Sequence, residues 1–276
     1  MSFSINTNVA SMNANLHSNS TNSGINKGLS ALASGSKLNS ASDNTSGLGI
    51  ADKLSSYVSG LGQAIMNANE SVGMLQVADG ALQGYSDNLD KVRVLTLKAS
   101  NGTMGSDDRA IIQKEIDGLL KSSDDIAKST KYNGMKLLDG TGGSFGNGMF
   151  VTQTGADGGA TQSVTIGDTQ VSSLVGKIDV TTQAAALGAM DTIESAMSKI
   201  GDIRSTLGAS QNQLESTIRN ISVTHINLAS AESQMRDVDF AAESATFSRQ
   251  NIMNQIGSFA QSQANAGASN VVGLLQ

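Results

Sequence analysis

The chain has 276 residues, with no cysteine, proline or tryptophan and only 6 Phe and 3 Tyr, so aromatic side chains contribute little to any core. Its formal charge of −6 argues against nucleic acid and anionic membranes as main partners, because both attract clusters of Lys and Arg. The absence of cysteine excludes disulfides, thiolate metal sites and thiol nucleophiles.

The two ends of the sequence are nearly free of charge. Residues 1–43 carry three charged side chains and residues 240–276 carry two, and both segments are rich in Ser, Asn, Gln and Ala. Such segments bury too little apolar area alone to offset chain entropy, so we predict that both ends fold against a partner. The first residues lack a basic stretch and an apolar run, so we expect no cleavable signal peptide. The sequence contains no run of about 18 apolar residues, so we expect no membrane-spanning helix.

A repeat of apolar residues at every seventh position predicts a long helix in the N-terminal half. The repeat consists of Leu54, Leu61, Ala68, Leu75, Leu82 and Leu89. A loop at residues 99–106 follows, and Ser106 is the predicted N-cap of a third helix that runs to about Lys128.

The middle of the chain is rich in turn signals. Residues 132–135 contain an Asn-Gly pair that predicts a tight turn, and residues 140–148 contain five glycines, which exclude regular structure. Short β-strands are predicted at residues 149–154, 163–166 and 170–175.

A second apolar repeat of period seven predicts a helix from about residue 183 to 268. Its positions are Ile193, Ile200, Leu207, Leu214, Ile221, Leu228, Met235 and Ala242. Two long helices with complementary seams are expected to pack side by side. The predicted fold class is therefore mainly α, a long antiparallel helical hairpin or coiled-coil rod with a small β-hairpin region around residues 141–182.

The residues that commonly carry catalysis form no recognisable constellation. His17 and His225 lie in different helical segments and neither has the spacing of a metal-ligand motif. The acids of the pair Asp107-Asp108 point about 100° apart on a helix, and their place in a first helical turn has a dipole explanation. We therefore predict a protein that is not an enzyme and that needs no cofactor and no metal.

Several short motifs, in order along the chain, resemble those of one known family. They are the Ile-Asn-Thr-Asn segment at 5–8, the Leu-Ala-Ser-Gly and Leu-Asn-Ser-Ala-Ser-Asp segments within 32–43, Gly-Leu-Gly-Ile-Ala at 47–51, Met-Arg-Asp-Val-Asp at 235–239, Gln-Ala-Asn at 263–265 and Leu-Leu at 274–275. Together they resemble bacterial flagellin in a short form that lacks large outer domains.

The resemblance implies a domain organisation and a function. Residues 1–43 and 237–276 would form an inner, discontinuous coiled-coil domain that is ordered on assembly, and residues 44–236 a rod domain of packed helices. The chain would be exported and would polymerise with copies of itself into the flagellar filament outside the cell. Expected partners are the flagellar export apparatus, a flagellin chaperone, and the cap and hook-junction proteins.

The resemblance also implies which residues form the interface in the filament core. These are Ile5, Asn6, Val9, Leu16, Leu29, Leu32, Leu38, Ile252, Ile256, Phe259, Val272, Leu274 and Leu275.

One further segment is similar to the part of flagellins that the innate Toll-like flagellin receptor binds. The matching residues are Leu89, Lys91, Arg93 and Leu95, with Glu115 on the next helix. Lys91 keeps the charge of the usual arginine but lacks its planar, bidentate guanidinium, so we expect weakened recognition.

Two alternatives remain open at the level of the sequence. A hook–filament junction protein of the flagellum has an N-terminus similar to that of flagellin, but it usually lacks a tail like residues 263–265. A secreted coiled-coil adhesin would explain the heptads and would leave the ordered motifs at both ends unexplained.

Overall fold

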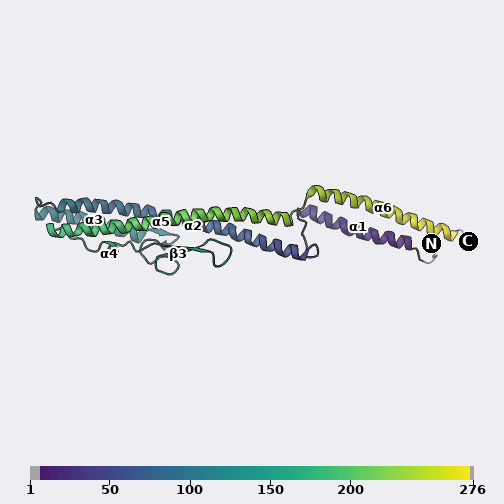
Figure 1. Ribbon diagram of the computed structural model, residues 1–276, viewed down its shortest axis with the longest axis horizontal. Coiled ribbons are helices and arrows are strands. Elements are labelled where there is room, and N and C mark those ends of the chain that lie inside the picture. The colour runs from purple at the N-terminus through teal and green to yellow at the C-terminus, as the bar shows by residue number, and fades with distance from the viewer. Residues whose placement is uncertain (1–6, 274–276) are drawn as a thin grey trace. The chain divides into compact units, whose positions relative to one another are not determined.

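The computed structural model describes residues 7–273 and shows a mainly α-helical protein with two small antiparallel β-hairpins (Figure 1), which confirms the predicted fold class. The helices are α1 (Val9–Ser34), α2 (Thr45–Ala99), α3 (Ser106–Ser129), α4 (Val171–Leu174), α5 (Gln183–Arg236) and α6 (Phe240–Gly273). The strands are β1 (Lys131–Tyr132), β2 (Met135–Lys136), β3 (Met149–Gln153) and β4 (Thr161–Thr165).

The chain divides into two compact units. The terminal unit comprises Met1–Ser56 and Asn227–Gln276, and the central unit comprises Tyr57–Ile226. In the terminal unit α1 lies beside α6 (Figure 1). In the central unit the long parts of α2 and α5 pack with α3 and with the β3–β4 hairpin.

The core of the central unit is built from aliphatic side chains that α2, α3 and α5 contribute at helical spacing. The largest fully buried aliphatic side chains on these helices are Leu75, Leu82, Leu89, Ile116, Ile193, Ile200, Leu207 and Leu214. The β3–β4 hairpin adds Phe150 and Val164, which face one another across the two strands and are also buried. An ion pair between Arg204 Nε and Asp79 Oδ1, 2.8 Å apart, joins α5 to α2 at the partly exposed edge of this packing.

The β1–β2 hairpin contains the tight turn that its Asn-Gly pair predicts. Asn133 has φ 49° and Gly134 has φ 80°, and Tyr132 pairs with Met135 across the turn. Positive φ at both central residues gives the backbone twist that a two-residue hairpin requires, which confirms the prediction.

The prediction of one helix from about residue 183 to 268 is wrong, because α5 ends at Arg236 and α6 begins at Phe240. The carboxylate oxygen Asp239 Oδ1 accepts hydrogen bonds from the backbone N–H of Ala241 (3.0 Å) and Ala242 (3.1 Å). These bonds satisfy donors in the first turn of a new helix, so Asp239 acts as an N-cap for α6.

Two smaller predictions also differ from the structure. Residues 171–174, predicted within a strand, form α4, because the N–H groups of Ser173 and Leu174 both donate to the carbonyl of Gln170, at 3.0 and 3.1 Å. Ser106 is the first residue of α3 rather than its N-cap; Gly105 takes that position, and no side chain caps the helix.

Candidate assembly surface

The helices of the terminal unit have defined ends. Asn8 Oδ1 accepts a hydrogen bond from the N–H of Ser11 at 3.0 Å and caps the start of α1. Gly35 ends α1 in the left-handed conformation, with φ 70°, which glycine adopts at little cost. Asp239 caps the start of α6, so both ends of α1 and the start of α6 are fixed by capping residues.

The faces on which α1 and α6 meet consist mostly of small or polar residues. Most buried and half-buried positions of α1 recur every three or four residues and are small or polar, namely Ser11, Ala14, Ser18, Thr21, Gly24, Gly28 and Ala31, while Ile25 and Leu32 are the half-buried apolar ones. Those of α6 include Glu243, Thr246, Phe247, Gln250, Asn254, Gly257, Gln261 and Ala264. Gly28 is the only buried residue of α1. The contact between the helices therefore buries few large apolar side chains.

Amide side chains make direct bonds across this contact. Asn8 Nδ2 donates to the carbonyl of Ala264 at 3.1 Å, and Asn254 Nδ2 donates to Asn22 Oδ1 at 2.9 Å. These partners show that the helices run antiparallel. Each such bond adds only about 1 kcal/mol net, less where water competes, so the amides orient the pair more than they stabilise it.

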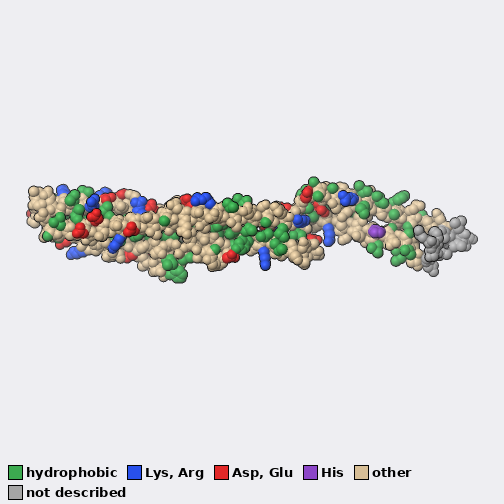
Figure 2. Space-filling view, in the orientation of Figure 1, with side chains coloured by type: hydrophobic (Ala, Val, Ile, Leu, Met, Phe, Trp, Pro, Cys, Tyr) green, Lys and Arg blue, Asp and Glu red, His purple; other side chains and the backbone are tan. Residues whose placement is uncertain are grey.

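Most large apolar side chains of the same two helices are exposed, and Figure 2 shows hydrophobic side chains on the visible outer surface of both. The exposed residues are Val9, Met12, Leu16 and Leu29 on α1, and Phe240, Ile252, Met253, Ile256 and Phe259 on α6. Leu16 is 69% exposed and Phe259 is 72% exposed. An apolar surface that extends along both helices of a pair marks a site of association with another molecule.

The predicted filament-core residues fall into three groups. Val9, Leu16, Leu29, Ile252, Ile256 and Phe259 are on the exposed apolar surface. Leu32 is half-buried and Leu38 is buried. Ile5, Asn6, Leu274 and Leu275 lie outside the described residues, as does the side chain of Val272.

The segment that follows α1 is joined to the segment between α5 and α6 by backbone bonds and by two side-chain bonds, from Ser36 Oγ to the carbonyl of Arg236 at 3.0 Å and from Lys37 Nζ to the carbonyl of Gln234 at 2.9 Å. The N–H of Lys37 donates to the carbonyl of Arg236 at 2.8 Å, and the N–H of Val238 donates to the carbonyl of Gly35 at 3.0 Å. Ser36 and Asp237 form an antiparallel bridge between them. This joint is the tertiary feature that accompanies the interruption between α5 and α6.

The predicted helix seam is divided between the two units. In the central unit Leu61, Leu75, Leu82, Leu89, Ile193, Ile200, Leu207, Leu214 and Ile221 are all buried. In the terminal unit Leu54, Leu228 and Met235 are half-buried. The seam is thus most completely covered where α3 and the β3–β4 hairpin add to the core.

The segment that resembles a receptor-binding site has both buried and exposed members. Leu89 is fully buried and Leu95 half-buried, whereas Lys91 and Arg93 are exposed on α2. Glu115 is exposed on α3. Lys91, Arg93 and Glu115 are therefore accessible on the central unit, whereas Leu89 and Leu95 pack against its core.

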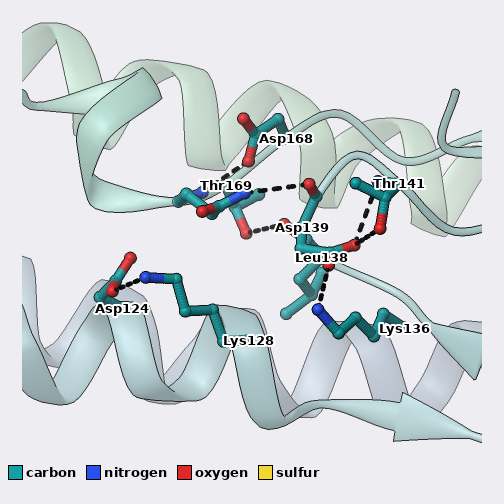
Figure 3. Close-up of polar contacts among 9 residues, drawn as sticks. Asp124, Lys128, Lys136, Leu138, Asp139, Thr141, Asp168 and Thr169 are labelled. Atoms are coloured by element: carbon teal, nitrogen blue, oxygen red, sulfur yellow. Dashed lines mark hydrogen bonds and ion pairs between the residues drawn. The ribbon is translucent and has the colours of Figure 1, made fainter.

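A buried carboxylate organises the connection between β2 and the glycine-rich loop. Figure 3 shows Lys136 and Thr141 reaching Asp139: Lys136 Nζ lies 2.8 Å from Oδ2, and Thr141 donates to Oδ1 from its hydroxyl at 2.8 Å and from its N–H at 3.1 Å. Burial opposes ionisation of Asp139, but the hydrogen bonds from Lys136 and Thr141 outweigh it and lower the pKa of this carboxyl. All of these contacts are local, so we assign Asp139 a structural role.

Neither a metal centre nor a membrane span is found between residues 7 and 273. No three His, Cys, Asp or Glu side chains gather there closely enough to hold a metal ion. None of the helices within that range combines the length and apolar character needed to cross a bilayer.

A helix pair with polar inner contacts and exposed apolar side chains is typical of subunits that complete their burial by self-association. The comparisons with known proteins identify the family. The model of the bacterial flagellin N-terminal helical region matches residues 5–142, and that of the C-terminal helical region matches residues 190–275. The chain belongs to the bacterial flagellin family, which is a family of structural proteins.

Relatives match over almost their full length. The chain is 35% identical to the flagellar filament 31.3 kDa core protein of Treponema maltophilum and 34% identical to the flagellin of Bacillus subtilis, in each case over 99% of both chains. The crystal structure of Bacillus cereus flagellin matches 60% of this chain and 94% of that chain, with 28% identity and a TM-score of 0.51. A flagellar hook-associated protein of Vibrio parahaemolyticus, 17% identical with a TM-score of 0.58, shares the fold over 71% of this chain and 100% of its own.

Proposed function

We propose that this chain is the structural subunit that polymerises into the bacterial flagellar filament and so serves swimming motility. The observation that carries the proposal is the outward exposure of large apolar side chains along both α1 and α6. Full-length similarity to filament core proteins and flagellins supports the same function.

The physical reason for polymerisation lies in the surface that one chain leaves uncovered. Fully burying a side chain such as Leu, Ile or Phe contributes about 1.5–3 kcal/mol, and the exposed side chains of α1 and α6 recover little of this within one subunit. Neighbouring copies that cover both helices would recover it. Because the two helices pair through small and polar residues, the apolar side chains remain free for contacts between subunits.

We propose that residues 1–43 and 237–276 form the inner part of the filament and that residues 44–236 form the helical rod domain. A head-to-tail contact whose rotation does not close generates an open helical polymer instead of a ring. The charge distribution agrees with this division, because the nearly neutral ends suit a packed interior and the charged middle suits a solvated outer surface.

The proposed route to the filament needs further components. The chain would pass unfolded through the flagellar export apparatus, after binding by a flagellin chaperone, and would be placed beneath the cap beyond the hook-junction proteins. A chain without disulfides or prolines suits this route, because neither cross-links nor slow isomerisation delays unfolding and refolding. The filament it forms lies outside the cell.

Electron microscopy of the purified chain tests the function directly. Sulfate strengthens apolar burial, so sulfate together with short filament seeds is expected to yield long helical filaments. Monomers that bind seed ends without elongating them would contradict the proposal and indicate a junction protein. A chain that stays monomeric and leaves the seeds unbound would contradict both functions.

A further inference from the structure

Two glycines of α1 each lie opposite a long side chain of α6. A Cβ atom at Gly24 would lie 2.6 Å from Gln250 Nε2 and 2.9 Å from Gln250 Cδ. A Cβ atom at Gly28 would lie 3.6 Å from Phe247 Cδ2 and 3.1 Å from Glu243 Oε1. The glycines are one helical turn apart, and so are Phe247 and Gln250, so two protrusions of α6 fit two recesses of α1.

Burial is concentrated at the same place. Gly28 is the only buried residue of α1, and Phe247 is half-buried on the inner face of α6. The Oε1 atom of Gln250 is buried without a hydrogen-bond partner. The end of this side chain therefore packs beside Gly24 without a hydrogen bond to that oxygen.

We propose that Gly24 and Gly28, with Phe247 and Gln250, set the register in which α1 and α6 pair, and so determine which apolar side chains face outward. The proposal rests on the proposed function, since it concerns the specificity of the same assembly surface. Polar and small contact faces tolerate sliding, because most neighbouring positions on them are alike in size. A glycine opposite a bulky side chain favours one alignment, because a larger residue in that place would overpack the contact.

A shift by one helical turn removes this fit in either direction. One shift places Phe247 opposite Gly24 and moves Gln250 to the region of Thr21; the other places Phe247 opposite Leu32. The first shift sets Gln250 against the branched side chain of Thr21, and the second sets Phe247 against the large side chain of Leu32, so both leave less room than glycine does. The observed register is the one in which both long side chains find glycine.

The test uses the fact that the chain has no cysteine. Asn254 Nδ2 lies 2.9 Å from Asn22 Oδ1, so cysteines introduced at both positions report the observed register by forming a disulfide under mild oxidation with copper phenanthroline, which links only closely apposed cysteines. Pairs of Asn22→Cys with Asn251→Cys or Ser258→Cys report shifts of one turn either way. Intramolecular links are separated from links between subunits by denaturing electrophoresis, in monomers and in sulfate-grown filaments.

Gly28→Leu is expected to lower the yield of the 22–254 link about tenfold and to raise the shifted links, because overpacking at this position opposes the native alignment. Gly28→Leu combined with Phe247→Ala moves the recess to the other helix and is expected to restore the 22–254 link. Gly257→Ala, at a helix glycine with open space around it, is the matched control and is expected to leave the link unchanged.

Two results in the variants would each overturn the register proposal: a predominant 22–254 link in Gly28→Leu, or no recovery in the double variant. Shifted links in the chain with native glycines would overturn it as well. Elongation of seeds by that same chain reports on the proposed function separately. If it does not elongate, the filament function fails while the link pattern still decides the register.

Discussion

Phe259→Ser is the most direct perturbation of the proposed assembly surface. Phe259 is 72% exposed on α6, so its removal takes little packing from the single chain. Serine and phenylalanine have similar helix propensities, so α6 itself is expected to persist. Any effect of the substitution on assembly then reflects contacts between copies.

The magnitude follows from the exposed fraction. Full burial of phenylalanine contributes about 1.5–3 kcal/mol, so covering the 72% that is exposed in the monomer contributes about 1–2 kcal/mol per subunit. The concentration of monomer that coexists with filaments is therefore expected to rise about 5- to 30-fold in Phe259→Ser. It is measured in the supernatant after sulfate-induced polymers are sedimented.

Phe145 offers a matched control, because it is also 72% exposed but lies on the glycine-rich loop of the central unit. Phe145→Ser is expected to change the coexisting monomer concentration by less than about twofold. The reasoning is refuted if Phe259→Ser polymerises like the parent chain, or if Phe145→Ser impairs polymerisation as much.

Deletion of residues 271–276 is expected to reduce polymerisation and leave helical circular dichroism nearly intact; undiminished sedimentation of polymer would contradict this. Leu214→Ala removes a fully buried side chain and is expected to destabilise the central unit by about 2–5 kcal/mol in urea unfolding, against little change for the exposed Leu187→Ala; equal midpoints would contradict it. The pKa of Asp139 is lower in the folded state, so its stabilising contribution is complete above the unfolded pKa and is lost as the pH falls through the folded pKa. Asp139→Asn is therefore expected to reduce the fall in the free energy of unfolding at acid pH. An unchanged acid dependence would refute this. In a receptor reporter assay with depolymerised protein, Lys91→Arg is expected to strengthen the response, and full potency of the parent chain would show that Lys91 does not weaken recognition.

The long helices could be predicted because their evidence is repeated many times along the chain. A period of seven in apolar residues specifies α2 and α5 independently of any tertiary contact, and no proline interrupts either helix. The Asn-Gly turn at residues 133–134 could be predicted for a similar reason, since the backbone conformation that it needs is one that these two residues favour.

The interruption between α5 and α6 could not be predicted from periodicity. Residues 235–239 contain neither glycine nor proline, and the apolar repeat continues through Met235 to Ala242. The helix ends there because the backbone of Arg236 and Val238 bonds to residues 35–37, which are distant in the sequence. The local signal is Asp239, a good N-cap residue, but the apolar repeat that continues on both sides of it favours one helix.

The sequence pattern that indicates the inner face of the terminal unit is weaker. The apolar residues of α1 and α6 indicated an interface, but the small residues between them carried the intramolecular contact. The four-residue spacing of Gly24 and Gly28 was the available sign of close helix packing. This spacing does not identify the side chain that packs against each glycine, because Phe247 and Gln250 are more than 200 positions away.

The joint between α1 and α6 has a consequence for genetic dissection of this protein. Its two backbone bonds run from the N–H of Lys37 and of Val238 to carbonyl oxygens, and changes of side chain leave these in place; only the bonds that Ser36 Oγ and Lys37 Nζ donate depend on side chains. A library of alanine substitutions would therefore remove only the side-chain bonds of the joint and leave its backbone bonds untested. Proline lacks a backbone N–H, so proline at position 37 or 238 would remove the donor of one of these bonds. A proline scan is therefore expected to detect the backbone bonds of the joint, which alanine substitutions leave intact.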